Sequence, residues 1–581
     1  MAGRFGPAVT TVAIKGAGSI LALSLALSGT AFAQRSGAAE PPRKAPARQA
    51  VAPVPPAVPP AAVAAFREGD RAMRNGDFDD AAAAFARASV ATPDNAVLRL
   101  VTGVALSTVR RVDLAVNEFR RATQLADEDP IAALLLHGAL AERGSVDAAQ
   151  SVYLDTVRRF SRGPEAGGGL EVSYPIRHLG HAIAQFPDSP ILHLLLGDAY
   201  QMGEQWERAD AAYRKAIALA PAWAKPRVNY GLSRLAQGQP DQAAQVFQQA
   251  LERDPRNAQV ILLKGEAERE AGRVKDAIVT YRMIENEPRV AAQAVTGLGQ
   301  AYAADGNVAE AIKNLNRAQK ISPRDPAPSA ALAEVQSRAG NFAAAEEAYD
   351  TALRLSRTGG LFGTQPVLYR ALAETQIAAG KPDAALETIK RALADEPTSG
   401  ALWHRLAGRA LVARGDRSRA AREFKVALDT DPSLFPMETL TAIEASGLME
   451  AIVRSYQAEA EGIGGYRPLP EQGGGIYLTV PTGPMLKESG ALEGRARARS
   501  ALAHFARYRN DVADEVRQRE TLTGLRSRAK DWFLLGEAYD QRAKEPARAA
   551  AAYKKALDLG GLSDDLAARA RARHRVLTTA P

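Results

Sequence analysis

A sequence pattern that returns every 34 residues is the strongest constraint on how this chain can fold. Within each repeat, position 8 is small, positions 20 and 27 are Ala, position 24 is aromatic or bulky, and position 32 is Pro. Five consecutive repeats starting near Pro190 keep the 34-residue step without a gap. The pattern also occurs before and after them, and near the C-terminus Gly536 and Tyr553 mark a last repeat with one extra residue. Such regularity predicts an array of small units rather than a single core.

The residue types in the pattern predict a pair of antiparallel helices in each repeat. Gly or Ala at positions 8, 20 and 27 permits close approach of two helices, and the bulky side chain at position 24 fills the space beside that contact. Gly near position 15 suits the turn between the helices, and Pro at position 32 ends the second helix. Because one helix pair cannot bury its apolar face alone, we expect neighbouring pairs to stack into an all-α solenoid.

This pattern resembles the tetratricopeptide repeat (TPR), over roughly Ala62 to Pro432 and Lys530 to Gly561. The resemblance implies a right-handed superhelix whose inner groove binds peptides or protein segments. Two stretches depart from it. The third repeat, around Gly138 and Ala149, is degenerate and is followed by a Gly-rich hinge with a partial repeat. The second stretch, 435–528, predicts a helix from Met437 to Glu461, a long loop over 462–490 that is either functional or disordered, and a return to helix over Leu492 to Leu525.

The N-terminus has the composition of a secretory signal peptide. Arg4 and Lys15 precede a short apolar run, and the run ends at an Ala-x-Ala site whose last residue is Ala33. We expect cleavage after Ala33 and a periplasmic location in a Gram-negative bacterium, with no transmembrane segment in the mature chain; the alternative is an uncleaved anchor. The Pro/Ala-rich stretch that follows, 34–61, favours an extended spacer over a docking motif.

The resulting domain prediction has eight parts. They are a signal peptide (1–33), a disordered linker (34–61), N-terminal TPR units (62–163), a hinge with a partial repeat (164–189), the main TPR array (190–434), an irregular helical segment (435–528), a C-terminal TPR unit (529–562) and a basic helical tail (563–581).

The TPR resemblance implies that positions 2, 5, 9 and 12 of each first helix face the groove. Position 9 carries acidic and amide side chains through the middle of the array, and positions 5 and 9 carry basic ones toward its end. They are either a solvated polar face or a charge-graded groove for a protein segment. The candidate partner-binding residues are Asp198, Glu266, Gln300, Glu334, Arg370, Glu374, Arg405 and Arg409.

Little in the sequence points to catalysis. Cysteine is absent, and no metalloprotease, phosphate-loop or serine-hydrolase motif occurs, so we expect no catalytic residue, cofactor or metal site. An enzyme would need its active site within Ser433 to Arg528, which is small for a catalytic domain. His178 and His181 lie close enough on one helix to share a metal, but no acidic ligand stands beside them at helical spacing.

The C-terminal helices are rich in arginine, and the formal charge of the whole chain is +8. Acidic residues interleave the arginines, whereas a nucleic-acid-binding protein needs a contiguous basic face with stacking aromatics, and the expected export also disfavours nucleic acid as a partner. A solvated surface is the simpler interpretation, followed by contact with anionic lipid headgroups or polysaccharide. The leading hypothesis is therefore a non-catalytic scaffold that binds other envelope proteins, similar to the TPR scaffolds of exopolysaccharide export. The alternative is a protein that binds the cell wall or an anionic polysaccharide through the Arg-rich helices.

Overall fold

The computed structural model describes residues 59–161, 169–358, 365–395, 400–430, 437–461 and 488–579. The expected signal peptide, nearly all of the expected linker, and 462–487 of the expected loop lie outside these residues. Within them the chain is an array of α-helices without a β-strand, apart from one isolated bridge between Ser161 and Leu170. The predicted fold class, an all-α TPR-like solenoid, is confirmed. Among the helices of the described ranges, none combines the length and apolar composition that a bilayer span requires.

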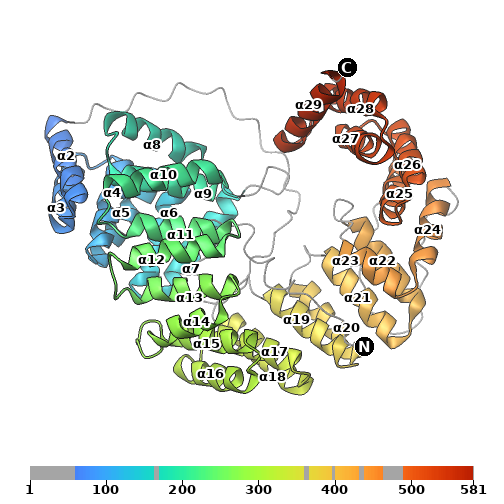
Figure 1. Cartoon of the computed structure of the whole chain (residues 1–581), viewed down its shortest axis with the longest axis horizontal. Helices are drawn as coiled ribbons and strands as arrows, with labels where there is room; N and C mark the ends of the chain where they lie inside the picture. Colours follow the sequence, from blue (N-terminus) through green and yellow to red (C-terminus); the bar gives the residue numbers. More distant parts are fainter. Residues whose placement is uncertain are drawn as a thin grey trace. The chain divides into compact units, whose positions relative to one another are not determined.

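The helices group into two compact units that divide near Leu368, in the first turn of α19 (Figure 1). The helices of the first unit are α2 (Pro60–Asn75), α3 (Phe78–Ala91), α4 (Ala96–Thr108), α5 (Val112–Leu125), α6 (Pro130–Glu142), α7 (Val146–Phe160), α8 (Ser173–Gln185), α9 (Pro190–Met202), α10 (Trp206–Leu219), α11 (Lys225–Ala236), α12 (Pro240–Leu251), α13 (Ala258–Glu270), α14 (Val274–Arg282), α15 (Ala291–Ala304), α16 (Val308–Ile321), α17 (Pro326–Arg338) and α18 (Phe342–Thr358).

The second unit continues the alternation of first and second helices. Its elements are α19 (Gln365–Ala378), α20 (Pro382–Asp395), α21 (Gly400–Arg414), α22 (Arg417–Thr430), α23 (Met437–Ala445), α24 (Met449–Glu461), α25 (Glu488–Tyr508), α26 (Val512–Leu525), α27 (Ala529–Glu537), a π-helix (Ala538–Ala543), α28 (Pro546–Leu559) and α29 (Asp564–Thr579). In both units nearly every first helix lies against the second helix that follows it, and successive pairs pack on each other, as α3 does on α4 and α22 does on α23.

Every helix pair in the described residues turns on a residue with a left-handed backbone. This residue stands at repeat position 15 (position 16 in the last repeat, which has one extra residue), and it is Gly in most pairs, such as Gly238 and Gly272 with φ of 70° and 76°. Arg110, Glu204, Asn510 and Lys544 hold the same conformation in the remaining pairs. A left-handed residue ends the first helix and reverses the chain within a few residues, which is why the sequence favours Gly there.

The small residue at position 8 and the ring at position 24 form the closest contact within a pair. A Cβ atom built on Gly197 would lie 2.6 Å from Cε1 of Tyr213, and one built on Gly103 would lie 2.5 Å from Cε1 of Phe119. The same contact joins Gly69 to Phe85, Gly231 to Phe247, Gly265 to Tyr281 and Gly408 to Phe424. Since real Cβ atoms do not approach other atoms so closely, these six rings lie where they do because position 8 has no side chain in their repeats.

In the third repeat, the structure moves the register by one residue from the alignment on Gly138. His137, which packs its ring 5.5 Å from the ring of Tyr153, occupies position 8, and its Nδ1 lies 2.8 Å from the carbonyl oxygen of Ala149. A Cβ atom at Gly138 would meet nothing within 4 Å. The repeat is degenerate because an imidazole replaces the small residue at position 8. The sequence prediction placed Gly138 there because it is the small residue next to His137.

The stretch predicted as two single helices, Met437 to Glu461 and Leu492 to Leu525, forms two helix pairs. The first pair, α23 and α24, turns at Gly447, and the second, α25 and α26, turns at Asn510. Both turn residues have positive φ, 66° and 60°. The apolar periodicity predicts helix on both sides of each turn, and that is what the structure has. The prediction of one continuous helix was wrong because a single residue in left-handed conformation divides it.

The extra residue of the last repeat is accommodated by the π-helix Ala538–Ala543, which widens the end of the first helix by one residue. Gly536 and Tyr553 still meet, with a Cβ on Gly536 falling 2.9 Å from Cδ1 of the ring. The expected basic tail is a packed helix, α29, because Ala570 is fully buried in the apolar cluster that α29 shares with α28.

Candidate interaction surface

The candidate surface is the inner face, meaning positions 2, 5, 9 and 12 of the first helix of each pair. In the first three pairs this face is mainly apolar and largely buried. Phe66 of α2, Leu100 and Val104 of α4, and Ile131 and Leu134 of α6 are each at most 1% exposed. They belong to one continuous apolar cluster that reaches from α2 to the loop after α10.

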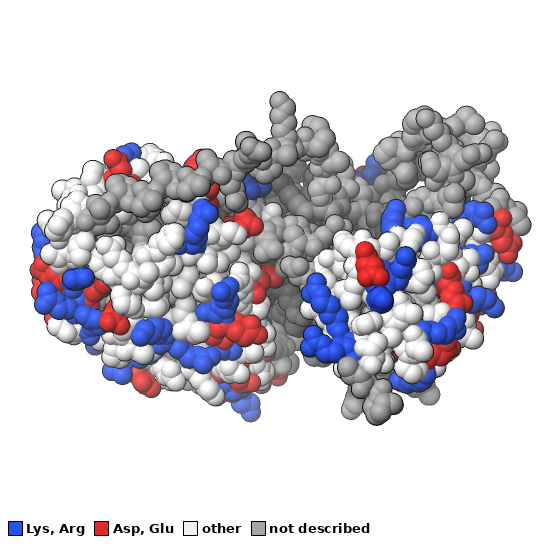
Figure 2. All heavy atoms as spheres, turned by 90° about the horizontal axis from the view of Figure 1, so that it is seen from above, with Lys and Arg blue, Asp and Glu red and all other residues white. Residues whose placement is uncertain are grey.

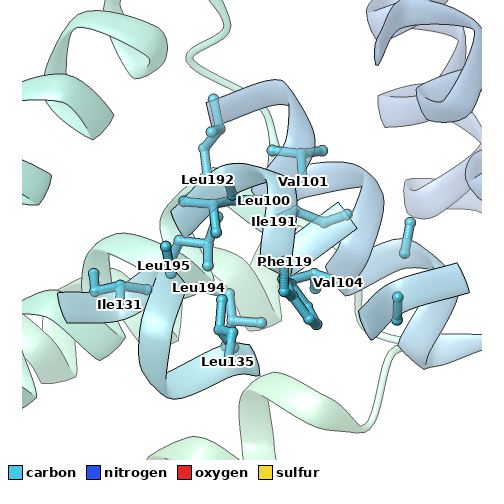
Figure 3. Close-up of a cluster of buried hydrophobic side chains, with 14 of the residues drawn as sticks. Leu100, Val101, Val104, Phe119, Ile131, Leu135, Ile191, Leu192, Leu194 and Leu195 are labelled. Atoms are coloured by element: carbon cyan, nitrogen blue, oxygen red, sulfur yellow. The ribbon is translucent and has the colours of Figure 1, made fainter. Parts of the chain in front are cut away.

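The side chains that cover this face come from the same chain. Helix α9 lies against α2, α4 and α6, and its own inner residues Ile191 and Leu194 are fully buried. Figure 3 shows Ile191, Leu192, Leu194 and Leu195 of α9 beside the side chains of α4 and α6. The first three repeats and α9 therefore close on each other, and this part of the inner face cannot receive a partner in this conformation.

One aromatic contact and two hydrogen bonds fix the edges of this closure across long sequence separations. The ring centroid of Phe66 lies 4.0 Å from that of Phe186, at the end of α8. Ser189 Oγ donates to Asp70 Oδ1 at 2.7 Å, and Trp223 Nε1 donates to Thr108 Oγ1 at 3.2 Å. Burial raises the pKa of the Asp70 carboxyl to about 7, against the opposing effect of the Ser189 hydrogen bond.

The candidate residue Asp198 lies inside this closed region and is 1% exposed. Its Oδ1 accepts from Tyr213 Oη and from Asn229 Nδ2, both at 2.8 Å. Burial raises the pKa of Asp198 to about 6, and the two hydrogen bonds oppose that rise. Asp198 therefore joins α9, α10 and α11 in the interior, and the interaction surface that we propose below excludes it.

Farther along the first unit most inner positions are partly exposed, and position 9 of each first helix from α13 to α17 carries a polar side chain. We call it the open inner face, and it comprises the inner positions of α13, α15 and α17, among them the candidates Glu266, Gln300 and Glu334. Its acidic side chains have basic neighbours on the same helix. Glu266 forms an ion pair with Arg269 and accepts from Tyr281 Oη at 2.9 Å, and Glu334 pairs with Arg338 at 2.5 Å. Burial acts to raise the pKa of Glu266, but the adjacent Arg269 guanidinium outweighs it and lowers that pKa below its usual value.

In the second unit the four remaining candidates lie on two neighbouring first helices, α19 and α21. Glu374 of α19 and Arg409 of α21 form an ion pair of 3.6 Å, with both side chains more than one third exposed. Arg370 and Arg405 are partly buried, and Nε of Arg370 is enclosed without a hydrogen-bond acceptor in the described ranges. Acidic candidates therefore lie on the open inner face, and basic candidates lie on α19 and α21. Each acidic candidate on these helices and on the open inner face has a basic side chain nearby that offsets its charge.

The basic helices at the C-terminus are similarly neutralised in part. Arg569 of α29 pairs with Glu537 at 2.6 Å, and Arg573 makes two contacts of 2.7 Å with the carboxylate of Asp540. These pairs attach α29 to α27 and the π-helix. On the visible faces of both units, basic and acidic side chains are interspersed (Figure 2). Ion pairs between exposed residues contribute little to stability, but they reduce the charge available to a polyanion.

Metal-ligating groups are not gathered anywhere in the described residues. No set of three or more His, Asp or Glu side chains there could hold a metal ion. The rings of His178 and His181 are 6.5 Å apart, and His178 stacks on Tyr174 instead. His404 Nδ1 lies 2.7 Å from Glu423 Oε2, which joins two helices of one repeat.

The sequence pattern did not predict one cluster of buried charged side chains. Glu515 and Arg519 of α26 are buried, 0% and 1% exposed, and Glu515 forms ion pairs with both Arg519 and Arg542 of the π-helix. With Asn510 at position 15, Glu515 falls at position 20 and Arg519 at position 24, where other repeats have Ala and a ring. The repeat positions of Glu515 and Arg519 follow from the position of the turn at Asn510, and the sequence pattern alone did not predict that turn.

Comparisons with known proteins agree with this architecture. Models described as tetratricopeptide repeat match residues 66–130, 193–222, 230–289, 302–358 and 366–408. A search of curated proteins found no significant match.

Similar solved structures include a tetratricopeptide repeat protein from Parabacteroides merdae, 18% identical, covering 47% of this chain and 99% of its own, with a TM-score of 0.33. A thermophilic TPR protein of Thermus thermophilus is 24% identical and covers 32% and 99% with a TM-score of 0.28. Pseudomonas aeruginosa pilF is 19% identical and covers 36% and 93% with a TM-score of 0.29.

The matched residues fall in both units, and they coincide with helix pairs that share the left-handed turn. The chain therefore contains tetratricopeptide repeats in both units and folds as a TPR-like helical solenoid.

Proposed function

We propose that this chain is a non-catalytic scaffold of the bacterial cell envelope that binds segments of partner proteins along its open inner face. The observation that carries the proposal is the contrast along the inner face of the first unit. The first three pairs and α9 bury most of their inner residues against each other, whereas α13, α15 and α17 leave most of theirs partly exposed, with Leu262 and Thr296 as the buried exceptions. TPR proteins are generally protein-interaction scaffolds, and the open inner face is the part of this surface that remains available.

The chemistry of the open inner face suits a peptide backbone. Gln293 and Gln300 of α15 are partly exposed, and each amide both donates and accepts. The carboxylates of Glu266 and Glu334 are held in place by Arg269 and Arg338, so they present fixed acceptors rather than a strong net charge. Ordered side chains of this kind reduce the entropy lost on binding.

A site-specific crosslink tests this proposal. A photo-reactive residue replaces Gln300 on the open inner face or, as a matched control, Lys313 on the second helix α16, whose side chain is 72% exposed. We expect the Gln300 position to capture a defined segment of an envelope protein and the Lys313 position to capture none of it. Equal capture at both positions, or capture at neither, would contradict binding along this face.

A groove variant gives a second readout on the same partner. Gln300→Arg, made in a chain that carries the photo-reactive residue at Gln293 of the same face, adds a bulky cation between the ion pairs of α13 and α17, and we expect it to abolish the crosslinked product in cells. Lys313→Arg keeps its charge outside the face and should leave the product unchanged. Circular dichroism of both purified variants verifies that each retains its helix content.

The envelope location rests on the composition of residues 1–33 and is part of the proposal. If the protein is exported, the chain isolated from the periplasmic fraction begins at Gln34, which N-terminal sequencing would reveal. A chain that retains Met1 and fractionates with the cytoplasm would refute the location but not protein binding. A role in exopolysaccharide export would follow if the captured partner belongs to such an export apparatus.

A further inference from the structure

Three departures from the repeat pattern meet at one place in the second unit. Position 20 of the pair α25–α26 is Glu515 instead of Ala, and position 24 is Arg519 instead of a ring. The extra residue of the following repeat produces the π-helix, and that element carries Arg542 to the same carboxylate. Repeats elsewhere in the array fill these positions with small and apolar side chains, so their replacement by charged groups calls for a physical explanation.

The geometry places three guanidinium groups around one buried carboxylate. Arg519 Nε donates to Glu515 Oε1 at 3.1 Å. Arg542 Nε lies 2.7 Å from Glu515 Oε2, and Arg507 Nη1 of α25 lies 3.9 Å from Oε1. Arginine stays protonated under all ordinary conditions. Within the described ranges none of the three pairs with another carboxylate, so the cluster holds two positive charges more than it neutralises.

Two further observations indicate an excess of positive charge. Nη1 of Arg519 is buried and has no hydrogen-bond acceptor among the described residues. Burial, assisted by the charges of Arg519, Arg507 and Lys530, lowers the pKa of the neighbouring His504 to about 3. An uncompensated buried charge is costly, and a bound anion is one way to reduce that cost.

We propose that this cluster is a binding site for a small oxyanion, a phosphate, a sulfate or the carboxylate of an acidic sugar. Arg507 and Arg542 are the residues through which it is reached, because their side chains are 40% and 21% exposed while Arg519 lies beneath them. Planar guanidinium groups bind oxyanions through paired N–H donors. One carboxylate has too few acceptor sites for the paired donors of three arginines. The site lies among α25, α26 and the π-helix, and it does not depend on protein binding at the open inner face.

The test uses the purified full-length chain and measures its thermal unfolding in sodium phosphate, sodium sulfate or sodium glucuronate. Sodium chloride at the same ionic strength is the reference. We expect a saturable rise in the midpoint with at least one of the oxyanions, because a ligand that binds only the folded state stabilises it. A response to the inorganic ions alone identifies a free ion as the ligand, and a response to glucuronate identifies an acidic sugar.

Three variants assign the response to the cluster. Arg507→Gln should weaken binding about tenfold, the effect of losing one charge-assisted hydrogen bond. Arg517→Gln is the matched control, since Arg517 lies on α26 with a 72% exposed side chain and pairs with Asp514 away from the cluster. Glu515→Gln should bind the oxyanion more tightly than the natural chain, because it removes the competing carboxylate. A purely structural ion-pair cluster would give no such gain.

The proposal is overturned if no oxyanion gives a saturable response above chloride. It is also overturned if Arg517→Gln weakens binding as much as Arg507→Gln, since the response would then reflect total charge. Neither outcome affects the crosslinking test of the open inner face, because that test reports a protein partner at another unit of the chain.

Discussion

The same substitution at two glycines should change stability in opposite directions. Gly197 of α9 stands at position 8, where an added Cβ would come within 2.6 Å of the Tyr213 ring. Gly138 of α6 stands one position later in its repeat, and a Cβ there would meet nothing within 4 Å. Both residues lie inside helices, so Gly→Ala changes helix propensity equally in the two variants.

The magnitudes follow from these two environments. Ala is favoured over Gly in a helix interior by about 1 kcal/mol, and G138A should gain stability of that order. G197A receives the same gain but forces a fully buried Tyr213 out of place, and overpacking of this kind costs about 1–3 kcal/mol. Because Tyr213 also donates to buried Asp198, its displacement weakens that hydrogen bond and moves the expected net result toward destabilisation.

The assay is urea unfolding followed by circular dichroism at 222 nm, with both variants compared to the natural chain in one buffer. We expect the midpoint to rise for G138A and to fall for G197A. Two falling midpoints of similar size would mean that Gly138 does occupy the crowded position, and the register assigned to the third repeat would be refuted. Two rising midpoints would show that the ring at position 24 moves at little cost, which would undermine the account of how each pair packs.

Four other outcomes follow from the structure. L194A removes a fully buried side chain of α9 from the closed region, and it should cost about 2–5 kcal/mol in urea unfolding and increase binding of an apolar dye. The free energy of unfolding of D70N should rise relative to that of the natural chain as the pH goes from 4 to 8. The raised pKa of Asp70 contributes stability at low pH that is lost as the pH rises to about 7, and Asn has no such dependence. A difference between the two proteins that does not change with pH would contradict this account. R110G should raise the free energy of unfolding by about 1 kcal/mol in urea unfolding, because Arg110 has a φ of 58° at the turn between α4 and α5; an unchanged free energy would mean that the turn carries no strain. Replacing Glu515 and Arg519 together by Ala and Phe restores the repeat pattern and should leave the chain as stable or up to ~4 kcal/mol more stable, whereas R519A alone should lose about 3–5 kcal/mol.

The helix pairs were predictable from the sequence because their determinants are local. A small residue at position 8, a ring sixteen residues later and a turn glycine between them act within one repeat, and several repeats supply the same evidence. The predicted register was wrong at Gly138 because either of two adjacent residues could stand at position 8. Only the contact between His137 and Tyr153 decides between them. The divided helices at Gly447 and Asn510 were missed because a single left-handed residue leaves the apolar periodicity nearly intact.

The closed region was not predictable from the repeat, because its contacts join residues about a hundred positions apart, as Asp70 and Ser189 show. The sequence nevertheless held a usable indication. Helices α6 and α9, with the runs IAALLL and ILHLLL, are apolar on nearly every side, whereas a helix at the surface of a solenoid keeps one polar side. An all-round apolar first helix therefore indicates that something covers the inner face. Among the candidate residues, this argument removes Asp198 and retains Glu266, Gln300 and Glu334.

A repeat array also provides its own internal comparison, since each repeat shows what a given position requires for packing. Position 24 needs only a bulky apolar group, as Phe85, Phe247 and Phe424 demonstrate by their complete burial. Arg519 fills the same volume but brings a charge that must lose its water, and Glu515 compensates only part of that loss. If the variant with Ala and Phe at these positions is the more stable protein, folding does not account for the charged pair. Its explanation then lies in what the cluster binds, and the loss of the oxyanion response in that same variant would connect the two measurements.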